Sequence, residues 1–311
     1  MEQLKEALSA AGIAYKENEP LCAHCTFRIG GPADLFVLPE NEEQLCAAIR
    51  LAKEAGVRSY LLGNGSNILF EDAGYRGAVI NVSAMKSGIG VIENISFPGK
   101  DPALTYDAVV VGAGQMLSSL CMAALENSLT GLEFAYGIPG TVGGAVYMNA
   151  GAYGGEMKDV LTTVRYLAAE GEVREVPAAE LDLRYRHSIF EENSGCILSA
   201  QFHLQPGNAA DIRAKMDELM AKRVEKQPLD KPSAGSTFKR PAGAFAAALI
   251  DQCGLRGYRH GGAAVSDKHC GFVVNLGGAT CADVLALCDE VRAIVKEKTG
   301  YDLEKEIRVV R

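Results

Sequence analysis

The sequence predicts a mixed α/β protein of two or three domains, and three observations lead to this prediction. The chain has 311 residues, which is enough to build more than one hydrophobic core. Segments with a helical spacing of apolar residues are interspersed with short apolar runs that are typical of strands. The strongest break lies around residues 225–240, where EKQPLDKPSAGSTFKRP combines three prolines with charged and small residues.

Helices and strands are expected to alternate irregularly along the chain. The first residues, MEQLKEALSAAG, have the pattern of an amphipathic helix. Further helices are expected at residues 41–55, 116–126, 209–224, 245–253 and 281–298. Strands are expected at residues 59–62, 78–82, 108–111, 160–168, 196–204, 272–275 and 306–310. Residues 85–106 are polar and rich in glycine and proline, which favours a hairpin tip or a surface loop.

The composition is ordinary for a soluble globular protein, with 48% hydrophobic and 23% charged residues. The net charge of −8 and the lack of a large Lys/Arg cluster argue against a nucleic-acid partner. No run of about 18 apolar residues is present, so we expect no membrane-spanning helix and no membrane partner. The N-terminal pattern differs from a secretion signal, which favours a cytoplasmic location.

The nine cysteines are scattered and are expected to act as small core hydrophobes. Cys22 and Cys25 have the spacing of a zinc-ligand pair or a redox pair. A zinc site would need a second pair at similar spacing, and none follows. We therefore expect no metal site.

Two glycine-rich segments are the most informative part of the sequence. One is the loop Gly63-Asn64-Gly65-Ser66-Asn67-Ile68, directly after a strand-like run, and the other runs over residues 137–144. Glycine permits positive φ and lets the backbone approach a ligand without interference from a Cβ. Successive exposed N–H groups can then cradle an anion such as a pyrophosphate. Two such loops favour an extended dinucleotide ligand over isolated turns.

Neither segment is an ordinary nucleotide fingerprint. The third glycine of G-x-G-x-x-G is missing after Gly65, and no acidic residue follows a second strand about 20 positions further on. No lysine completes a Walker loop.

Six segments together carry a resemblance to a known family. They are TFRIGGPAD at residues 26–34, the loop 63–68, residues 137–155, YRHS at 185–188, AGSTFK at 234–239 and LEKEIR at 303–308. In this order, and over nearly the whole chain, they resemble the UDP-N-acetylenolpyruvoylglucosamine reductases, flavoenzymes that make UDP-N-acetylmuramate for bacterial peptidoglycan.

The resemblance implies an α+β architecture: a two-lobed FAD-binding fold of the vanillyl-alcohol-oxidase (PCMH) type plus a C-terminal α/β substrate domain. The first lobe would comprise residues 1–84 and receive the last strand, 303–311. The second lobe would comprise residues 85–204, and the substrate domain 205–302. The resemblance also implies a monomer with non-covalent FAD as cofactor, NADPH as co-substrate and UDP-N-acetylglucosamine enolpyruvate as substrate.

The matching motifs also indicate which residues would bind FAD, with the glycines letting main chain line the pyrophosphate and the flavin. These residues are Arg28, Gly63, Asn64, Gly65, Ser66, Asn67, Ile68, Gly112, Gly137, Ile138, Pro139, Gly140, Thr141, Gly143 and Gly144.

In the family's reaction, hydride moves from NADPH to flavin N5 and then to C3 of the enolpyruvyl ether, and an acid protonates C2. Arg186 suits the substrate carboxylate, because a guanidinium stays charged and can form two parallel bonds. Without the family match, Arg186 would be read as part of a solvated strand edge. Glu306 is expected near the same carboxylate, either orienting Arg186 or delivering a proton; otherwise it is a polar residue that opens the last strand. Ser236 matches the proton donor, although SAGS alone is typical of a turn.

Tyr185, Lys239 and Arg240 are expected to bind substrate, with Lys239 either holding the diphosphate or assisting Ser236. Some family members have asparagine in place of Arg240, which puts the role of this residue in question. The short segment after Arg186 leaves no room for the substrate-capping loop of the longer subtype, so the chain resembles the shorter subtype. His260 and His269 match the substrate domain and are either structural or catalytic.

Two other classes of protein share part of these features. An FAD-dependent oxidase would have the flavin fold but neither the Arg186, Ser236 and Glu306 set nor the C-terminal domain. A non-catalytic nucleotide-binding protein would have lost the chemistry. Intact candidates at all three positions favour the reductase.

Overall fold

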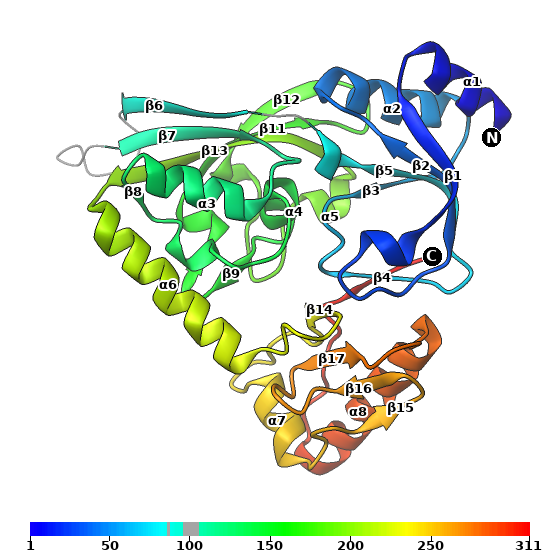
Figure 1. The fold of residues 1–311 in the computed structure, drawn as a ribbon, viewed down its shortest axis with the longest axis vertical. Coiled ribbons are helices and arrows are strands. Elements are labelled where there is room, and N and C mark those ends of the chain that lie inside the picture. The colour runs from blue at the N-terminus through cyan, green and yellow to red at the C-terminus, as the bar shows by residue number, and fades with distance from the viewer. Residues whose placement is uncertain (86–87, 96–105) are drawn as a thin grey trace. The chain divides into compact units, whose positions relative to one another are not determined.

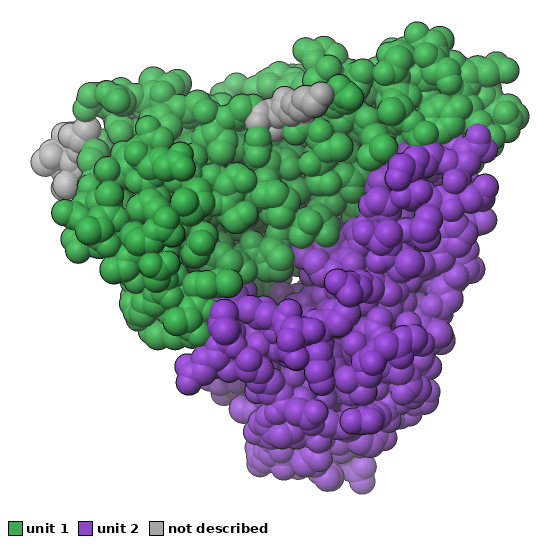
Figure 2. Space-filling model, viewed as in Figure 1, with its two compact units in different colours: residues 1–15, 37–64, 80–222 green, residues 16–36, 65–79, 223–311 purple. Residues whose placement is uncertain are grey.

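The computed structural model describes residues 1–85, 88–95 and 106–311. Its contacts group the chain into two compact units, and each unit is assembled from several segments (Figure 2). Unit 1 comprises residues 1–15, 37–64 and 80–222, and unit 2 comprises residues 16–36, 65–79 and 223–311. The division falls between Asn64 and Gly65, so each unit contains part of the first glycine-rich loop.

The largest sheet lies in unit 1 and is antiparallel. Its strands have the order β12-β11-β13-β7-β6, and β8 pairs with the end of β13 (Figure 1). The bounds are β6 Ile89–Ile95, β7 Tyr106–Gly112, β8 Leu129–Thr130, β11 Leu161–Leu167, β12 Val173–Pro177 and β13 Cys196–Pro206. Val109, Val164 and Phe202 are fully buried on these strands, as is typical of β-branched and aromatic side chains in a sheet.

Three helices add apolar side chains to the same core: α3 (Leu117–Glu126), α4 (Val142–Tyr147) and α6 (Ala209–Lys226). The buried residues that they contribute include Leu117, Leu120, Val142, Val146, Ile212 and Met216. The short elements of this unit are η2 Val82–Ala84, η3 Glu133–Ala135, β9 Gly151–Ala152, β10 Gly155–Glu156, η4 Met157–Asp159, η5 Ala178–Glu180 and α5 Phe190–Asn193.

A second sheet has the strand order β1-β2-β5-β3. Its strands are β1 Ala14–Pro20, β2 Pro32–Leu38, β3 Ser59–Leu62 and β5 Tyr75–Asn81, and η1 (Leu21–His24) follows β1. Helices α1 (Glu2–Ala10) and α2 (Glu42–Glu54) pack on each other in unit 1. The Asn41 side chain caps α2 by accepting the Gln44 N–H at 2.9 Å.

Unit 2 contains an antiparallel sheet of order β14-β17-β16-β15, with helix α8 contacting β15 and β16 (Figure 1). Its elements are β14 Ser233–Ser236, α7 Ala246–Gln252, β15 Arg259–His260, β16 Ala263–Val265, β17 Phe272–Asn275 and α8 Cys281–Thr299. A capping box between Thr280 and Asp283 begins α8, and Gly300 ends it with φ 80°. The last strand, β18 (Arg308–Val310), pairs in parallel with β4 (Ile68–Phe70).

The predicted helices are confirmed: α1, α2, α3, α6, α7 and α8 lie where helical spacing was expected. Each predicted strand run overlaps an observed strand, from β3 to β18. Of the segment 85–106, residues 89–95 form β6, antiparallel to β7; part of this segment lies outside the described residues. The three-domain division stays a prediction.

The cysteines have the environment expected of core residues. Seven of them are buried and unbridged, namely Cys25, Cys121, Cys196, Cys253, Cys270, Cys281 and Cys288. Burial raises the pKa of the Cys121, Cys196 and Cys288 thiols to about 12, which keeps them protonated and unreactive. No helix in the described ranges combines the length and apolarity needed to cross a membrane.

Candidate active site

The two glycine-rich loops touch each other within unit 1. A Cβ placed on Gly63 would lie 2.6 Å from the Thr141 Oγ1 atom, so only glycine lets the loops approach this closely. The Asn81 side chain supports the first loop by donating from Nδ2 to the Gly63 carbonyl at 3.3 Å. The sequence did not indicate Asn81 as a residue of the site. Its signal is a buried asparagine at the end of an apolar strand, where its amide can bind the next loop.

The second loop is bound to the segment that follows Gly112. Val142 and Gly143 donate their N–H groups to the carbonyls of Gln115 and Ala113, at 2.8 and 2.9 Å. Thr141 caps α4 by accepting the Gly144 N–H on Oγ1 at 3.3 Å. The amides of Val142, Gly143 and Gly144 are therefore engaged by the protein itself. A Cβ on Gly143 would lie 2.8 Å from the Ala113 Cβ, so close packing of the chain explains this glycine directly.

Four further amides lie on the touching loops, those of Gly63, Asn64, Gly140 and Thr141. None of them takes part in the bonds to Gln115, Ala113 and Thr141 Oγ1 that engage Val142, Gly143 and Gly144. Gly137 and Gly140 adopt φ 87° and 152°, values that favour glycine. Ile138 and Pro139 lie between them. Ile138 is half-buried and Pro139 is exposed. Closely spaced backbone N–H groups of this kind have the chemistry of an anion-binding site.

Unit 2 contains the remainder of the first loop, Gly65 to Ile68. The Gly65 carbonyl accepts the Thr26 N–H at 3.2 Å, and Ser66 continues the loop in a half-buried position. Arg28, which is exposed and has φ 55°, lies two residues after Thr26 in the chain. Asn67 connects the loop to the C-terminal segment: its Nδ2 donates to the Glu306 carbonyl at 3.3 Å, and its carbonyl accepts the Arg308 N–H at 3.0 Å.

Ser236 and Glu306 lie on two paired stretches of unit 2. The Glu306 N–H donates to the Thr237 carbonyl, and the Lys239 N–H donates to the Glu304 carbonyl, both at 2.8 Å. Ser236 also ends β14 opposite Phe272 of β17. SAGS, which in isolation is typical of a turn, forms a short strand here, interrupted by a register shift where Gly235 has φ 74°.

The side chains expected at the substrate diphosphate lie at the end of the same stretch. Lys239 Nζ is 2.7 Å from Glu304 Oε1, so its charge is paired. The Arg240 guanidinium lies 4.6 Å from the centre of the Phe245 ring, a cation–π contact on an exposed loop. Phe245 is 60% exposed, which is unusual for a phenylalanine.

Arg186 lies at the tip of a tight turn in unit 1. Arg184 and His187 exchange backbone hydrogen bonds at 3.1 and 3.3 Å, which leaves Tyr185 and Arg186 as the two turn residues. The segment is thus a turn and not the strand edge that would be expected without the family match. Arg186 has φ 55°, an uncommon conformation that costs about 1–3 kcal/mol and clusters at functional sites. Its Nη2 donates to the Gly151 carbonyl at 3.1 Å.

Two tyrosines near this turn, Tyr185 and Tyr153, are exposed. Tyr185 is 43% exposed and stacks under the Arg186 guanidinium, 5.1 Å from ring centre to Cζ. Tyr153 is 45% exposed at the tip of the β9–β10 hairpin, with φ 54°. Both rings are accessible to a ligand.

The two histidines of the C-terminal domain have structural partners. His260 Nδ1 lies 2.8 Å from Glu290 Oε1. His269 accepts the Gly271 N–H on Nδ1 at 3.1 Å and packs edge-on against Phe272. Burial lowers the pKa of His269, which favours its neutral form.

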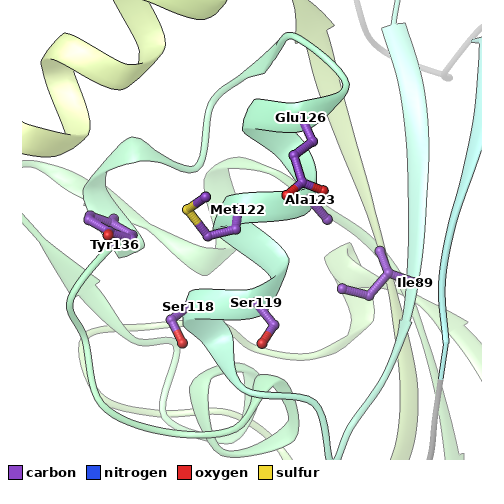
Figure 3. Close-up of a pocket in the computed structure, with 7 residues that line it drawn as sticks. All are labelled: Ile89, Ser118, Ser119, Met122, Ala123, Glu126 and Tyr136. Carbon is purple, nitrogen blue, oxygen red and sulfur yellow. The ribbon is translucent and has the colours of Figure 1, made fainter.

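A cavity of about 430 Å³ lies beside α3 in unit 1. Figure 3 shows its lining, with α3 in the middle, Ile89 on one side and Tyr136 on the other. It contains none of the residues predicted to bind cofactor or substrate, so it is separate from the candidate site.

Comparison with protein families identifies the class of this protein. Residues 33–177 match the model of an FAD-binding domain, and they include both glycine-rich loops. Residues 227–310 match the C-terminal domain of UDP-N-acetylenolpyruvoylglucosamine reductase. The chain is thus a flavoprotein with an FAD-binding fold and a separate C-terminal domain, which confirms the predicted fold class.

Whole-chain relatives narrow the class to a family. The UDP-N-acetylenolpyruvoylglucosamine reductase of Lachnoclostridium phytofermentans is 48% identical over 100% of this chain and 96% of its own length. That of Clostridioides difficile is 45% identical over 95% of this chain and 93% of its own. The crystal structure of the Thermus caldophilus reductase covers 96% of this chain and 99% of its own, with 32% identity and a TM-score of 0.75. The chain belongs to the UDP-N-acetylenolpyruvoylglucosamine reductase family, and so to the FAD-dependent oxidoreductases.

Proposed function

We propose that this protein uses NADPH to reduce UDP-N-acetylglucosamine enolpyruvate to UDP-N-acetylmuramate, as a monomer, in peptidoglycan precursor synthesis. One observation supports the proposal: in each unit, part of a glycine-rich loop is linked by contacts to residues that are expected to take part in the reaction. In unit 1, helix α4 begins at the Thr141 cap, and the carbonyl of its last residue, Tyr147, accepts the Ser188 hydroxyl just after the Arg186 turn at 2.7 Å. In unit 2, Asn67 binds the backbone of Glu306, which pairs beside Ser236.

The loops have donors that fit the pyrophosphate of FAD. The N–H groups of Gly63, Asn64, Gly140 and Thr141 can bind its oxygens without a side chain in the way. Arg28 adds a positive charge close in sequence to Thr26, which binds the same loop. When bound, FAD supplies a carrier for hydride, which is taken from NADPH at N5 and given to C3 of the enolpyruvyl group.

Arg186 is proposed to bind the substrate carboxylate. Hydride addition at C3 pushes the double-bond electron pair toward C2 and the carboxylate, so negative charge grows where a guanidinium can form two bonds. A donor placed where charge develops contributes about 3–4 kcal/mol, by analogy with oxyanion holes. Glu306 is proposed to act at the same carboxylate, as an orienting group or as a proton source.

Ser236 is proposed to donate the proton to C2. A serine hydroxyl is a weak acid, so this role requires the strongly basic carbon that forms once hydride has added. Tyr185, Lys239 and Arg240 are proposed to bind the rest of the substrate. The Lys239 ammonium, which is paired with Glu304, would bind the diphosphate by exchanging this partner for a phosphate oxygen.

An anaerobic titration tests the proposal. The purified protein should be yellow, should lose its colour with NADPH, and should regain it when UDP-N-acetylglucosamine enolpyruvate is added without oxygen. Recovery of colour with oxygen alone would instead support an oxidase. Protein that never loses its colour with NADPH would support a binding protein without this chemistry.

A further inference from the structure

One buried side chain, Asn149, joins the two hairpins next to Arg186. Asn149 is 0% exposed, yet its amide makes three hydrogen bonds within unit 1. Nδ2 donates to the Arg184 carbonyl at 3.0 Å and to Glu156 Oε2 at 2.7 Å. Oδ1 accepts the Lys158 N–H at 3.0 Å. A side chain with two donors and an acceptor is required here, which neither leucine nor aspartate supplies.

Two of the three groups that Asn149 binds belong to the two hairpins, and the third, the Lys158 N–H, lies in η4. Arg184 begins the turn that carries Arg186, and Glu156 ends the β9–β10 hairpin. Arg186 itself bonds the first residue of β9, Gly151. The Arg186 guanidinium is thus held both by its own turn and by its bond to the neighbouring hairpin. Asn149 binds the turn and the hairpin.

The conformations at these tips need such support. Arg186 and Tyr153 have φ values of 55° and 54°, which residues with a Cβ adopt only where their surroundings hold them. The Arg186 turn has neither glycine nor asparagine at its two central positions, and the β9–β10 tip has a glycine at position 154 but not at Tyr153. Bonds from a rigid buried group to both hairpins provide the constraint.

We infer that Asn149 is a positioning residue for Arg186, setting the guanidinium for the carboxylate of an enolpyruvyl substrate. The inference rests on the proposed function, because it takes the role of Arg186 from there. The chain has other means of keeping the fold here: Ser188 Oγ donates to the Tyr147 carbonyl at 2.7 Å, and Glu156 and Asp159 form a capping box. Removing the amide should therefore loosen the placement of Arg186 more than the fold.

A double-mutant cycle measures this coupling. Asn149→Ala, Arg186→Ala and the double variant are purified as holoenzymes, and the two half-reactions are followed separately without oxygen. Asn149→Ala should slow flavin reoxidation by substrate about 10–100-fold, since small misplacements of a reacting group cost about this much. Flavin reduction by NADPH should stay within about 3-fold. In the Arg186→Ala background, Asn149→Ala should add less than about 3-fold, because the two residues act as one unit.

Two further variants separate positioning from folding. Asn149→Asp keeps the size of the side chain but removes both donors, and it should slow reoxidation in the same way. Leu8→Ala truncates another fully buried residue of unit 1, in α1, and should lower Tm without changing either half-reaction.

The outcomes distinguish this inference from the proposed function. The positioning role would be overturned if the losses in reoxidation rate of the two single variants multiplied in the double variant. It would also be overturned if Asn149→Ala reoxidised at the wild-type rate. Either result would leave the proposed role of Arg186 intact. If Arg186→Ala itself reoxidised normally, the proposed function of Arg186 would fail, and the role of Asn149 with it. Loss of flavin from both Asn149 variants would make Asn149 a folding residue and would also overturn the inference.

Discussion

The turn that carries Arg186 and the stretch that carries Ser236 and Glu306 are held in different ways. In unit 1, side chains make the contacts: the Asn149 amide binds the Arg184 carbonyl, and the Arg186 guanidinium binds the Gly151 carbonyl. In unit 2, backbone pairing brings Ser236 and Glu306 close, through Thr237 and Glu304.

This difference predicts which substitutions each region tolerates. A backbone ladder persists when neighbouring side chains change, whereas a side-chain network is lost with a single residue. The kinetics of the Arg186 region should therefore depend on residues that never touch substrate. The kinetics of the unit 2 pair should depend mainly on Ser236 and Glu306 themselves.

The largest effect is expected for Ser236→Ala. Loss of a general acid typically costs about 10²–10⁴-fold, so reoxidation of the reduced flavin by substrate should fall by this factor while reduction by NADPH is unchanged. Stopped-flow absorbance without oxygen measures both steps. Ser233→Ala, at the other end of β14, is the matched control and should behave as wild type. An equal loss in both steps would refute the role of Ser236.

Thr237→Val tests whether backbone pairing alone is sufficient to hold Ser236 and Glu306 in place. Thr237 is 2% exposed, and its Oγ1 accepts the Val273 N–H at 2.9 Å, so the variant leaves a buried donor unpaired. The free energy of unfolding should fall by about 1–3 kcal/mol. Both half-reactions of the folded enzyme should stay within about 3-fold, because the Glu306 bond uses the Thr237 backbone. A loss as large as that of Ser236→Ala would show that the comparison is wrong. Urea denaturation measures the free energy of unfolding, and rapid mixing measures the rates of the two half-reactions.

Gly63→Ala examines the close contact between the loops of unit 1. The new Cβ would meet Thr141 Oγ1 at 2.6 Å, and overpacking of this kind costs about 1–3 kcal/mol. We expect weaker flavin retention, measured by equilibrium dialysis against FAD. Gly90→Ala, where a Cβ meets nothing within 4 Å, should retain flavin normally. Equal flavin affinity in the two variants would mean that the loop contact does not shape the site.

The sequence predicted the long helices well and the site geometry only in part. Helix α8 has 19 residues with regularly spaced Val284, Leu287 and Val291, which a local pattern reveals. Strand β14 has only the residues SAGS, and its extended form comes from β17 and from residues 304–306, which are distant in sequence. The family resemblance identified Ser236 and Glu306 as candidates but contained no information on how they are held.

The Arg186 turn is a second feature that the local sequence does not predict. Arg-Tyr-Arg-His lacks the glycine, proline or asparagine that signals a turn, so its local pattern favours a strand edge. The turn depends on Asn149, 35 positions earlier, whose amide binds the Arg184 carbonyl. Motif matching therefore identified candidates for the reacting residues, whereas the contacts that hold these candidates come from segments distant in sequence.

The smallest effect is expected at the Lys239–Glu304 ion pair. With side-chain exposures of 32% and 72% the pair is largely solvated, and such pairs contribute about 0–1 kcal/mol to stability. Glu304→Gln should therefore leave Tm nearly unchanged. It should lower the KM for substrate by no more than about 3-fold, because the Lys239 ammonium no longer has to leave a carboxylate to meet a diphosphate. Lys239→Met should raise the same KM, and kcat should change little in either variant. If Glu304→Gln raised KM as Lys239→Met does, the carboxylate would be positioning the lysine rather than competing for it, and unit 2 would contain a side-chain support of the kind found around Arg186.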